Sequence, residues 1–277
     1  MLVNVPQFNS IEEINSAYRD LWKEYRKKSG LESVRKYLDR WPIQYDTNIK
    51  SQPLLFVGFN PSYDDDNKPL QLSEDEVLDD SLEIKKAIED ERTAQRGKAE
   101  DKKERYSYYS VFPEICEAIK LGKEDWNHID LMPFRHRTQG DLIGDFQMDT
   151  DIPEWFKGED SKKELIRECV SIFLGYIEYL KPKVIVVVNG FVSKMIIQHT
   201  GSYYLNHFKN TNINNNEAKD VFSFYLSGSP NKVRRFLRIK NEYPVLLSSM
   251  LTGQRALDLG SRERLIWSID QIRGEIA

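Results

Sequence analysis

The 277-residue sequence has little cysteine, little histidine, no excess of positive charge and no long hydrophobic run. Its two cysteines, Cys116 and Cys169, are far apart and lack metal-ligand spacing, which is typical of reduced thiols in a cytosolic protein. The longest apolar stretch, Val184 to Val188, is too short to span a bilayer. The first residues also lack the basic and apolar regions of a signal peptide. We therefore expect a cytoplasmic protein with no membrane partner, and no obligate protein partner is evident.

The charge balance argues against a surface that binds nucleic acid over its whole area. The formal net charge is −4, with 40 Lys and Arg against 44 Asp and Glu. Any nucleic-acid surface must then be a local patch. One candidate is the run from Lys232 to Lys240, which includes Arg234, Arg235 and Arg238, although an exposed strand face explains this pattern equally well.

Predicted strands alternate with predicted helices along most of the chain. Apolar spacing indicates helices within 10–40, where Ser10 is a good N-cap and Gly30 a break, and over 110–121, 160–180 and 261–273. Buried strands are expected at 54–57, 128–132, 184–188 and 244–248, with a hairpin of 222–226 and 233–239 around the sequence GSPN. This alternation predicts a three-layer α/β/α sandwich with a central four-stranded, mainly parallel sheet.

The predicted domain organisation is a helical extension over 1–50 followed by an α/β domain over 51–277. Residues 72–104 are dense in charge and are expected to form an insertion in this domain. The insertion is either an exposed helix or a mobile lid, and a solvated face without a function is the simplest interpretation. Ligands bind at the carboxyl ends of the strands in open parallel sheets, so functional residues are expected there.

The first strand ends in Gly58-Phe59-Asn60-Pro61-Ser62. Gly58 permits a tight turn close to a ligand, and Pro61 restricts the backbone on both sides of it. This turn holds the Asn60 side chain in a defined place, where an amide can orient water or bind the edge of a base. Alternatively, the segment is a plain strand-terminating turn in which Asn60 caps the backbone.

The next two strand ends carry further polar groups. Asp130 ends the second strand and is followed by a proline turn and a basic cluster of Arg135, His136 and Arg137. This acid either serves a site or forms an ion pair within the loop. Arg135 and Arg137 are candidate DNA contacts. The third strand ends at Asn189, which suits either substrate binding before a helix N-terminus or a plain Asn-Gly turn.

The last strand runs into hydroxyls, a glycine and an arginine. Such side-chain and backbone donors are able to hold a phosphate. An exposed Leu251 is able to enter a base stack as an apolar wedge, whereas a buried one only completes the core. The candidate DNA-binding residues in this segment are Ser248, Ser249, Leu251, Thr252, Gly253 and Arg255.

Taken in order, these motifs resemble the uracil-DNA glycosylase superfamily over roughly residues 50–270. The segment from Gly58 to Ser62 matches its G-x-N-P-S motif, which implies that Asn60 positions the hydrolytic water. Tyr109-Ser110-Val111 is similar to its F-S-V stretch, which implies that Tyr109, or Tyr108 in a shifted register, stacks on the flipped base. The alignment of LSSMLTGQRAL, residues 247–257, with its second motif implies that Ser249 and Arg255 contact the phosphates and that Leu251 intercalates.

Two departures from the family pattern bear on the substrate. Leu247 replaces the histidine that stabilises the leaving base, and none of the four histidines (128, 136, 199 and 207) replaces it by position. Asp130 stands where the family usually has a base-reading asparagine. A carboxylate only accepts hydrogen bonds, which suits the exocyclic amine of cytosine, and a protonated Asp130 is also able to donate to cytosine N3.

We therefore expect a monofunctional DNA glycosylase that flips and excises a modified cytosine and leaves an abasic site. Ordinary cytosine occurs throughout the genome, so a selective enzyme needs a modified base, and hypermodified phage DNA fits such a role in antiviral defence. No metal or cofactor is required. The alternatives are a uracil or mismatch repair glycosylase, an inactive DNA-binding module of the same fold, and a hydrolase or transferase acting on free nucleosides or nucleotides.

Overall fold

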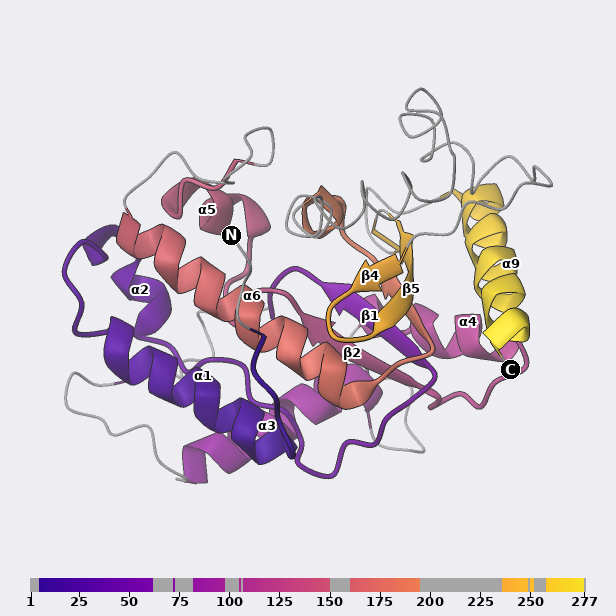
Figure 1. Cartoon of the computed structure of the whole chain (residues 1–277), viewed down its shortest axis with the longest axis horizontal. Coiled ribbons are helices and arrows are strands. Elements are labelled where there is room, and N and C mark those ends of the chain that lie inside the picture. Colours follow the sequence, from indigo (N-terminus) through magenta and orange to yellow (C-terminus); the bar gives the residue numbers. More distant parts are fainter. Residues whose placement is uncertain are drawn as a thin grey trace. The chain divides into compact units, whose positions relative to one another are not determined.

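A computed structural model describes residues 5–61, 72, 82–97, 105, 107–149, 160–194, 236–248, 250–251 and 258–276 (Figure 1). The chain forms two compact units. Unit 1 contains Met1–Ser51, Gly58–Tyr109 and Ile129–Leu180, and unit 2 contains Gln52–Val57, Ser110–His128 and Lys181–Ala277. The structure thus groups the N-terminal helices with later segments, whereas the sequence suggested a separate extension over 1–50.

The structure confirms the expected fold class, a three-layer α/β fold with a mainly parallel sheet. Its order is β2-β1-β3-β5-β4. The four strands expected from the sequence are β1 (Leu54–Gly58), β2 (Trp126–Asp130), β3 (Val184–Val187) and β5 (Glu242–Leu247). Every residue of β1, β2 and β3 is buried, which explains the continuous apolar runs of β1 and β3.

A fifth strand, β4 (Phe236–Arg238), pairs antiparallel with β5 through Phe236 opposite Pro244. The predicted hairpin of 222–226 with 233–239 stays a prediction, and residues 236–238 pair with the strand that follows them. Three residues join the two strands, and the Ile239 amide donates to the Asn241 carbonyl at 2.9 Å. Residues 222–226 lie outside the described part of the chain.

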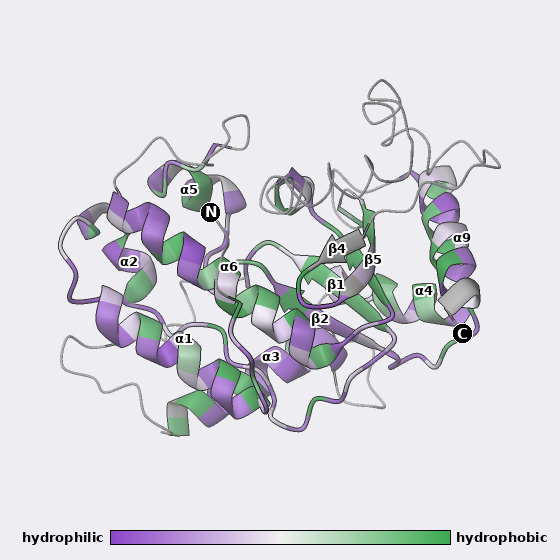
Figure 2. Ribbon diagram, viewed as in Figure 1, coloured by the Kyte–Doolittle hydropathy of each residue, from purple (hydrophilic) through white to green (hydrophobic). Residues whose placement is uncertain are grey.

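Unit 1 is built on two long helices, α1 (Ile11–Tyr25) and α6 (Asp160–Leu180), which pack side by side (Figure 1). The Ser10 hydroxyl accepts a hydrogen bond from the Glu13 amide at 3.2 Å, so the predicted N-cap is confirmed. Hydrophobic and hydrophilic residues alternate around α1 in Figure 2, because one face of this helix is buried. The other helical elements of this unit are η1 (Glu32–Val34), α2 (Arg35–Leu38), α3 (Leu82–Arg96), η3 (Ser107–Tyr109) and α5 (Gln139–Asp145).

Gly175 in α6 lets the N-terminal segment lie directly against the helix. A Cβ atom at this position would come within 2.7 Å of the Phe8 ring and 2.9 Å of the Pro6 carbonyl oxygen. We expect Gly175→Ala to lower the free energy of unfolding by about 1–3 kcal/mol through overpacking. Urea titration measures this, with Gly274→Ala in α9 as the control because a Cβ there meets nothing within 4 Å. Equal stability of the two variants would contradict the packing of this segment.

Unit 2 contains α4 (Val111–Ala118) and α9 (Leu259–Ile276) besides most of the sheet. An ion pair of Arg262 with Glu114 and a 2.7 Å hydrogen bond from Arg273 to the Ile119 carbonyl hold α9 against the α4 region. The ring of Phe112 on α4 stacks on Phe56 of β1 at 4.1 Å between centroids. Among the described residues, no helix is both long and apolar enough to cross a membrane.

His128 of β2 gives unit 2 a measurable sensitivity to acid. Its ring is buried and stacked on Phe112 at 5.8 Å, and burial lowers its pKa from 6.5 to about 3. Between these two values the unfolded chain binds the proton and the folded chain does not, so stability falls as the pH drops below 6.5. We expect a loss of about 1.4 kcal/mol for each pH unit in this window.

His128→Phe should reduce this loss of stability at acid pH, while it keeps an aromatic ring against Phe112. Urea titrations of both proteins between pH 4 and pH 7 measure the difference. An unchanged slope in His128→Phe would contradict the assignment.

Candidate active site at the ends of β1 and β2

The segments that follow β1 and β2 run side by side within unit 1. The Leu131 amide donates to the Gly58 carbonyl at 3.2 Å, and the Met132 amide donates to the Phe59 carbonyl at 2.7 Å. These bonds extend the pairing of the strands beyond the sheet. They fix the predicted site residues Asn60 and Asp130 at neighbouring strand ends, as expected for a parallel sheet.

The Asn60 side chain is held by two backbone carbonyls. Its Nδ2 donates to the Pro61 carbonyl at 3.0 Å and to the His136 carbonyl at 2.8 Å. The His136 amide also donates to the Pro61 carbonyl at 3.1 Å, which locks the two loops together. Both amide protons of Asn60 are thereby used. Its Oδ1 has no hydrogen-bond partner among the described residues, and it is left as an acceptor that can orient a water molecule.

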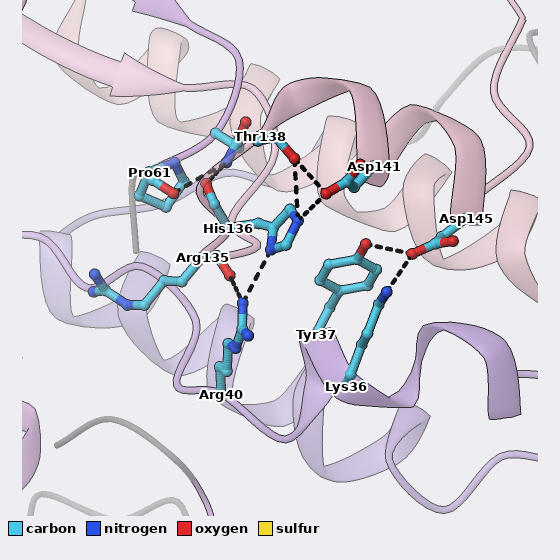
Figure 3. A network of polar contacts seen from close by, with 10 residues as sticks. Lys36, Tyr37, Arg40, Pro61, Arg135, His136, Thr138, Asp141 and Asp145 are labelled. Carbon is cyan, nitrogen blue, oxygen red and sulfur yellow. Dashed lines mark hydrogen bonds and ion pairs between the residues drawn. The ribbon is translucent and has the colours of Figure 1, made fainter. Parts of the chain in front are cut away.

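The His136 ring lies between Arg40 and Asp141 (Figure 3). Arg40 Nη1 is 3.1 Å from Nδ1, and because a guanidinium only donates, Nδ1 is the acceptor. The other ring nitrogen then carries the proton and donates to the Asp141 carboxylate at 3.1 Å. Hydrogen bonds from Thr138 and His136 lower the pKa of Asp141, which keeps this carboxylate ionised. The tautomer of His136 is therefore fixed from both sides.

The same network reaches α2 through a second carboxylate. The Tyr37 hydroxyl and the Lys36 ammonium both contact Asp145, at 2.5 and 2.7 Å (Figure 3). The Tyr37 ring also meets the His136 ring edge-on at 5.1 Å between centroids. These contacts make the loop that holds Asn60 a rigid support, so an amide anchored to it keeps one orientation.

Asp130 is buried, with 3% of its surface exposed. Burial raises its pKa well above the usual range, the nearby Glu91 carboxylate raises it further, and Arg135 lowers it. Burial and Glu91 prevail, so the protonated form is more favoured than in an exposed aspartate. A protonated carboxyl both donates and accepts a hydrogen bond, as the asparagine of the family pattern does.

Tyrosines from three separate segments interact with Asp130. Tyr18 on α1, Tyr45 before β1 and Tyr108 on η3 all interact electrostatically with its carboxyl group. The rings of Tyr18 and Tyr45 lie 6.5 Å apart and are both buried. Asp130 thus lies within the electrostatic range of three tyrosines, two of which are buried.

The two predicted stacking candidates lie edge to face, with ring centroids 4.9 Å apart. Tyr109 is buried, whereas Tyr108 is half-buried and interacts with Asp130. The shifted register, with Tyr108 as the stacking ring, therefore fits the structure better than Tyr109.

The basic cluster after β2 divides into an interior and an exposed arginine. Arg135 is 3% exposed, pairs with Glu91 and donates from Nε to the Trp41 carbonyl at 3.1 Å. A guanidinium held in the interior does not present a surface to phosphate, so we withdraw Arg135 from the predicted DNA contacts. Arg137 is exposed and remains a candidate.

Two predictions in unit 2 also need correction. The Asn189 side-chain oxygen accepts hydrogen bonds from the Phe191 and Val192 amides at 3.0 and 3.1 Å. It thus caps the helical turn over 190–194, and this structural role accounts for the asparagine in place of the predicted substrate contact. Leu251 is only 6% exposed, so the prediction of an exposed wedge is wrong for this structure.

The other predicted contacts are only partly described. Ser248 is half-buried, and its amide donates to the Val187 carbonyl at 2.8 Å, which continues the pairing of β5 with β3. The remaining predicted residues, Ser62, Ser249, Thr252, Gly253 and Arg255, lie outside the described part of the chain. Residues 232–235 of the basic run over 232–240 also lie outside it.

Several residues of the site carried no signal in the sequence. Glu91 lies in the charge-dense insertion and was not distinguishable from its exposed neighbours. Arg40, Tyr18 and Tyr45 are distant in sequence from both motifs, and only the fold brings them close. Asp141 lies five residues after His136 and had no distinguishing pattern. His136 was noticed as part of a basic cluster, which did not reveal that its carbonyl anchors Asn60.

In comparisons with known proteins, no family model matches this chain and no curated protein is significantly similar to it in sequence.

Proposed function

We propose that this chain is a monofunctional DNA glycosylase that excises a cytosine-type base, with a modified cytosine as its substrate. The observation that carries the proposal is that a hydrogen-bond acceptor and a buried carboxyl group lie at neighbouring strand ends. Asn60 presents a fixed acceptor oxygen, and Asp130 presents a buried carboxyl group that favours its protonated form. A water acceptor beside a proton donor suits hydrolysis of an N-glycosidic bond.

The choice of cytosine follows from the leaving group. Uracil departs with negative charge on its carbonyl oxygens and needs a hydrogen-bond donor that stabilises this charge. The position of that donor in the family motif is occupied by Leu247. Cytosine has a basic N3, so a protonated Asp130 is able to donate to it while the second oxygen accepts from N4–H. Both departures from the family motifs, Leu247 in place of histidine and Asp130 in place of asparagine, are therefore consistent with a cytosine-type base.

A target base inside a duplex must be extruded before either residue reaches it. Tyr108, which is half-buried beside Asp130, is the ring that we assign to stack on the extruded base. Water held by Asn60 Oδ1 then attacks the anomeric carbon as the glycosidic bond breaks. This leaves an abasic site without a covalent enzyme intermediate.

A second candidate is a hydrolase that acts on free nucleosides or nucleotides. The buried position of Leu251 favours it, because a free nucleotide leaves no gap in a base stack to be filled. Both candidates use the same two residues and differ only in the size of the substrate.

Oligonucleotides that carry uracil, cytosine, 5-hydroxymethylcytosine or glucosylated hydroxymethylcytosine test the proposal. Alkali converts abasic sites to strand breaks, and the matching free nucleosides are assayed for base release. Breaks confined to cytosine-type bases are expected. Breaks at uracil alone would preserve the enzyme class and overturn the role of Asp130. Activity on nucleosides alone would select the second candidate, and binding without cleavage would indicate a DNA-binding module.

A further inference from the structure

One arginine holds the loop that positions Asn60. Arg40 Nη1 donates to the Arg135 carbonyl at 2.9 Å and lies 3.1 Å from His136 Nδ1 (Figure 3). The Arg40 carbonyl accepts a hydrogen bond from the indole of buried Trp22 at 2.8 Å, which ties this arginine to the core of unit 1. The guanidinium therefore bridges two consecutive residues of the loop after β2, one through the backbone and one through the ring.

The peptide group between Arg135 and His136 is held at both ends. Arg40 binds its carbonyl, and its amide donates to the Pro61 carbonyl at 3.1 Å. Because the peptide group is planar, these two contacts fix its orientation and restrict the backbone of His136 that follows it. The His136 carbonyl accepts the shorter of the two hydrogen bonds from Asn60 Nδ2, at 2.8 Å. Loss of the Arg40 contact would release one end of this peptide group and loosen the acceptor of Asn60.

The contact between Arg40 and the His136 ring requires a neutral imidazole. A guanidinium only donates hydrogen bonds, so Nδ1 must supply the lone pair. Histidine is the side chain whose charge changes between pH 5 and pH 8. Protonation would turn Nδ1 into a donor and place a second positive charge 3.1 Å from Arg40 Nη1, so the contact would open.

Titratable groups face this ring from two sides. Asp141 on α5 accepts from Nε2 at 3.1 Å and favours the protonated ring, whereas Arg40 after α2 favours the neutral one. The Asp141 side chain is 63% exposed, so solvent screens its charge. Burial raises the pKa of Tyr37, which meets the ring edge-on and stays neutral near pH 7. The two charges behind Tyr37, Lys36 and Asp145, pair with each other at 2.7 Å.

We propose that His136 is a positioning residue that acts through Asn60: its neutral ring lets Arg40 hold the loop and keep the Asn60 amide in one orientation, and its protonated ring releases this anchor. Base excision should then weaken as the pH falls through the titration of His136. The loss should lie in kcat rather than in KM, since Asn60 acts on the attacking water. This consequence rests on the proposed function, whereas the chain of contacts from Arg40 to Asn60 does not.

Nuclear magnetic resonance of the full chain tests the proposal without an activity assay. The Asn60 side-chain amide signals, assigned as the pair absent in Asn60→Ala, are followed between pH 5 and pH 8. Their hydrogen-exchange rate is divided by that of the Asn15 amide, which is buried and donates to the Tyr45 carbonyl at 2.8 Å. The division cancels the intrinsic effect of pH on exchange. We expect the ratio to rise about fivefold as His136 is protonated, which corresponds to the loss of one hydrogen bond.

Three variants separate the acceptor of the ring from its titration. His136→Asn keeps an oxygen close to the position of Nδ1 but cannot be protonated, so the ratio should stay low at every pH. His136→Phe keeps a ring against Tyr37 but has no acceptor, so the ratio should be high at every pH. Asp141→Asn removes the charge that favours the protonated ring, so the rise should begin at a lower pH than in the parent protein.

The ratio also distinguishes release of Asn60 from a general loss of structure, because unfolding exposes the Asn60 and Asn15 amides together. A ratio that is independent of pH in the parent protein would overturn the role of His136. A rise of equal size in His136→Asn, or a low ratio in His136→Phe, would overturn it as well. A ratio that behaves as expected in a protein without base-releasing activity would uphold the role and reject only the proposed function.

Discussion

Replacement of Asn60 by alanine is expected to lower base excision by about 10²–10⁴-fold, since it removes the group that orients the attacking water. The amide is fixed by the Pro61 and His136 carbonyls, so its oxygen cannot be replaced by a neighbouring side chain without moving the loop. Single-turnover cleavage of a 5-hydroxymethylcytosine duplex, followed by alkali, measures this rate. Binding of the same duplex should be nearly unchanged, because the loss concerns the chemical step.

Stability measurements separate this effect from local unfolding. The variant loses two hydrogen bonds to backbone carbonyls, which we expect to cost about 1–3 kcal/mol in the free energy of unfolding. Asn48→Ala is the matched control, because Asn48 is exposed and bonds only to Asp46 within its own turn. Full excision activity in folded Asn60→Ala would exclude this residue from catalysis.

Asp130→Asn is expected to have the second large effect, with loss of excision at cytosine-type bases by about 10²–10⁴-fold. The amide has nearly the shape of the acid and still donates and accepts, but it has no proton to transfer to the leaving base. The ratio of cytosine-type to uracil excision should therefore fall. Parallel time courses on the two oligonucleotides measure this ratio, and Asp20→Asn, whose side chain is 68% exposed, is the control.

The pH dependence of stability independently shows whether folding raises or lowers the pKa of Asp130. Because this pKa is raised on folding, the folded chain binds the proton between the unfolded and the folded values. The contribution of Asp130 to stability is therefore complete below its unfolded pKa and is lost as the pH rises through the folded one. Asp130→Asn should remove this decline, and a decline that persists unchanged would mean that Asp130 is ionised in the folded chain.

The elements that the sequence predicted well have a strong local signal. Buried strands such as β3 are continuous apolar runs, and the Ser10 cap has acidic residues in the first turn of its helix. The position of Asn60 followed from the Gly58 turn and from Pro61, which both act on the neighbouring backbone. These features depend on residues within one turn or one strand.

The elements that it missed depend on contacts between distant segments. The basic cluster after β2 does not show that Arg135 is buried, because its partner Glu91 is 44 residues away. The loop sequence around Leu251 fits an exposed tip as well as a buried side chain, and only packing decides between them. The pairing of residues 236–238 with β5 was not predicted, because the three residues that join these strands contain no glycine or proline.

The most direct test of the central claim is the identification of the released base. Duplex DNA with one 5-hydroxymethylcytosine is incubated with the protein, and the small molecules set free are analysed by mass spectrometry. The account predicts free 5-hydroxymethylcytosine in equal amount to abasic sites, and neither product with Asn60→Ala. Intact DNA and no free base from any cytosine-type oligonucleotide would contradict it.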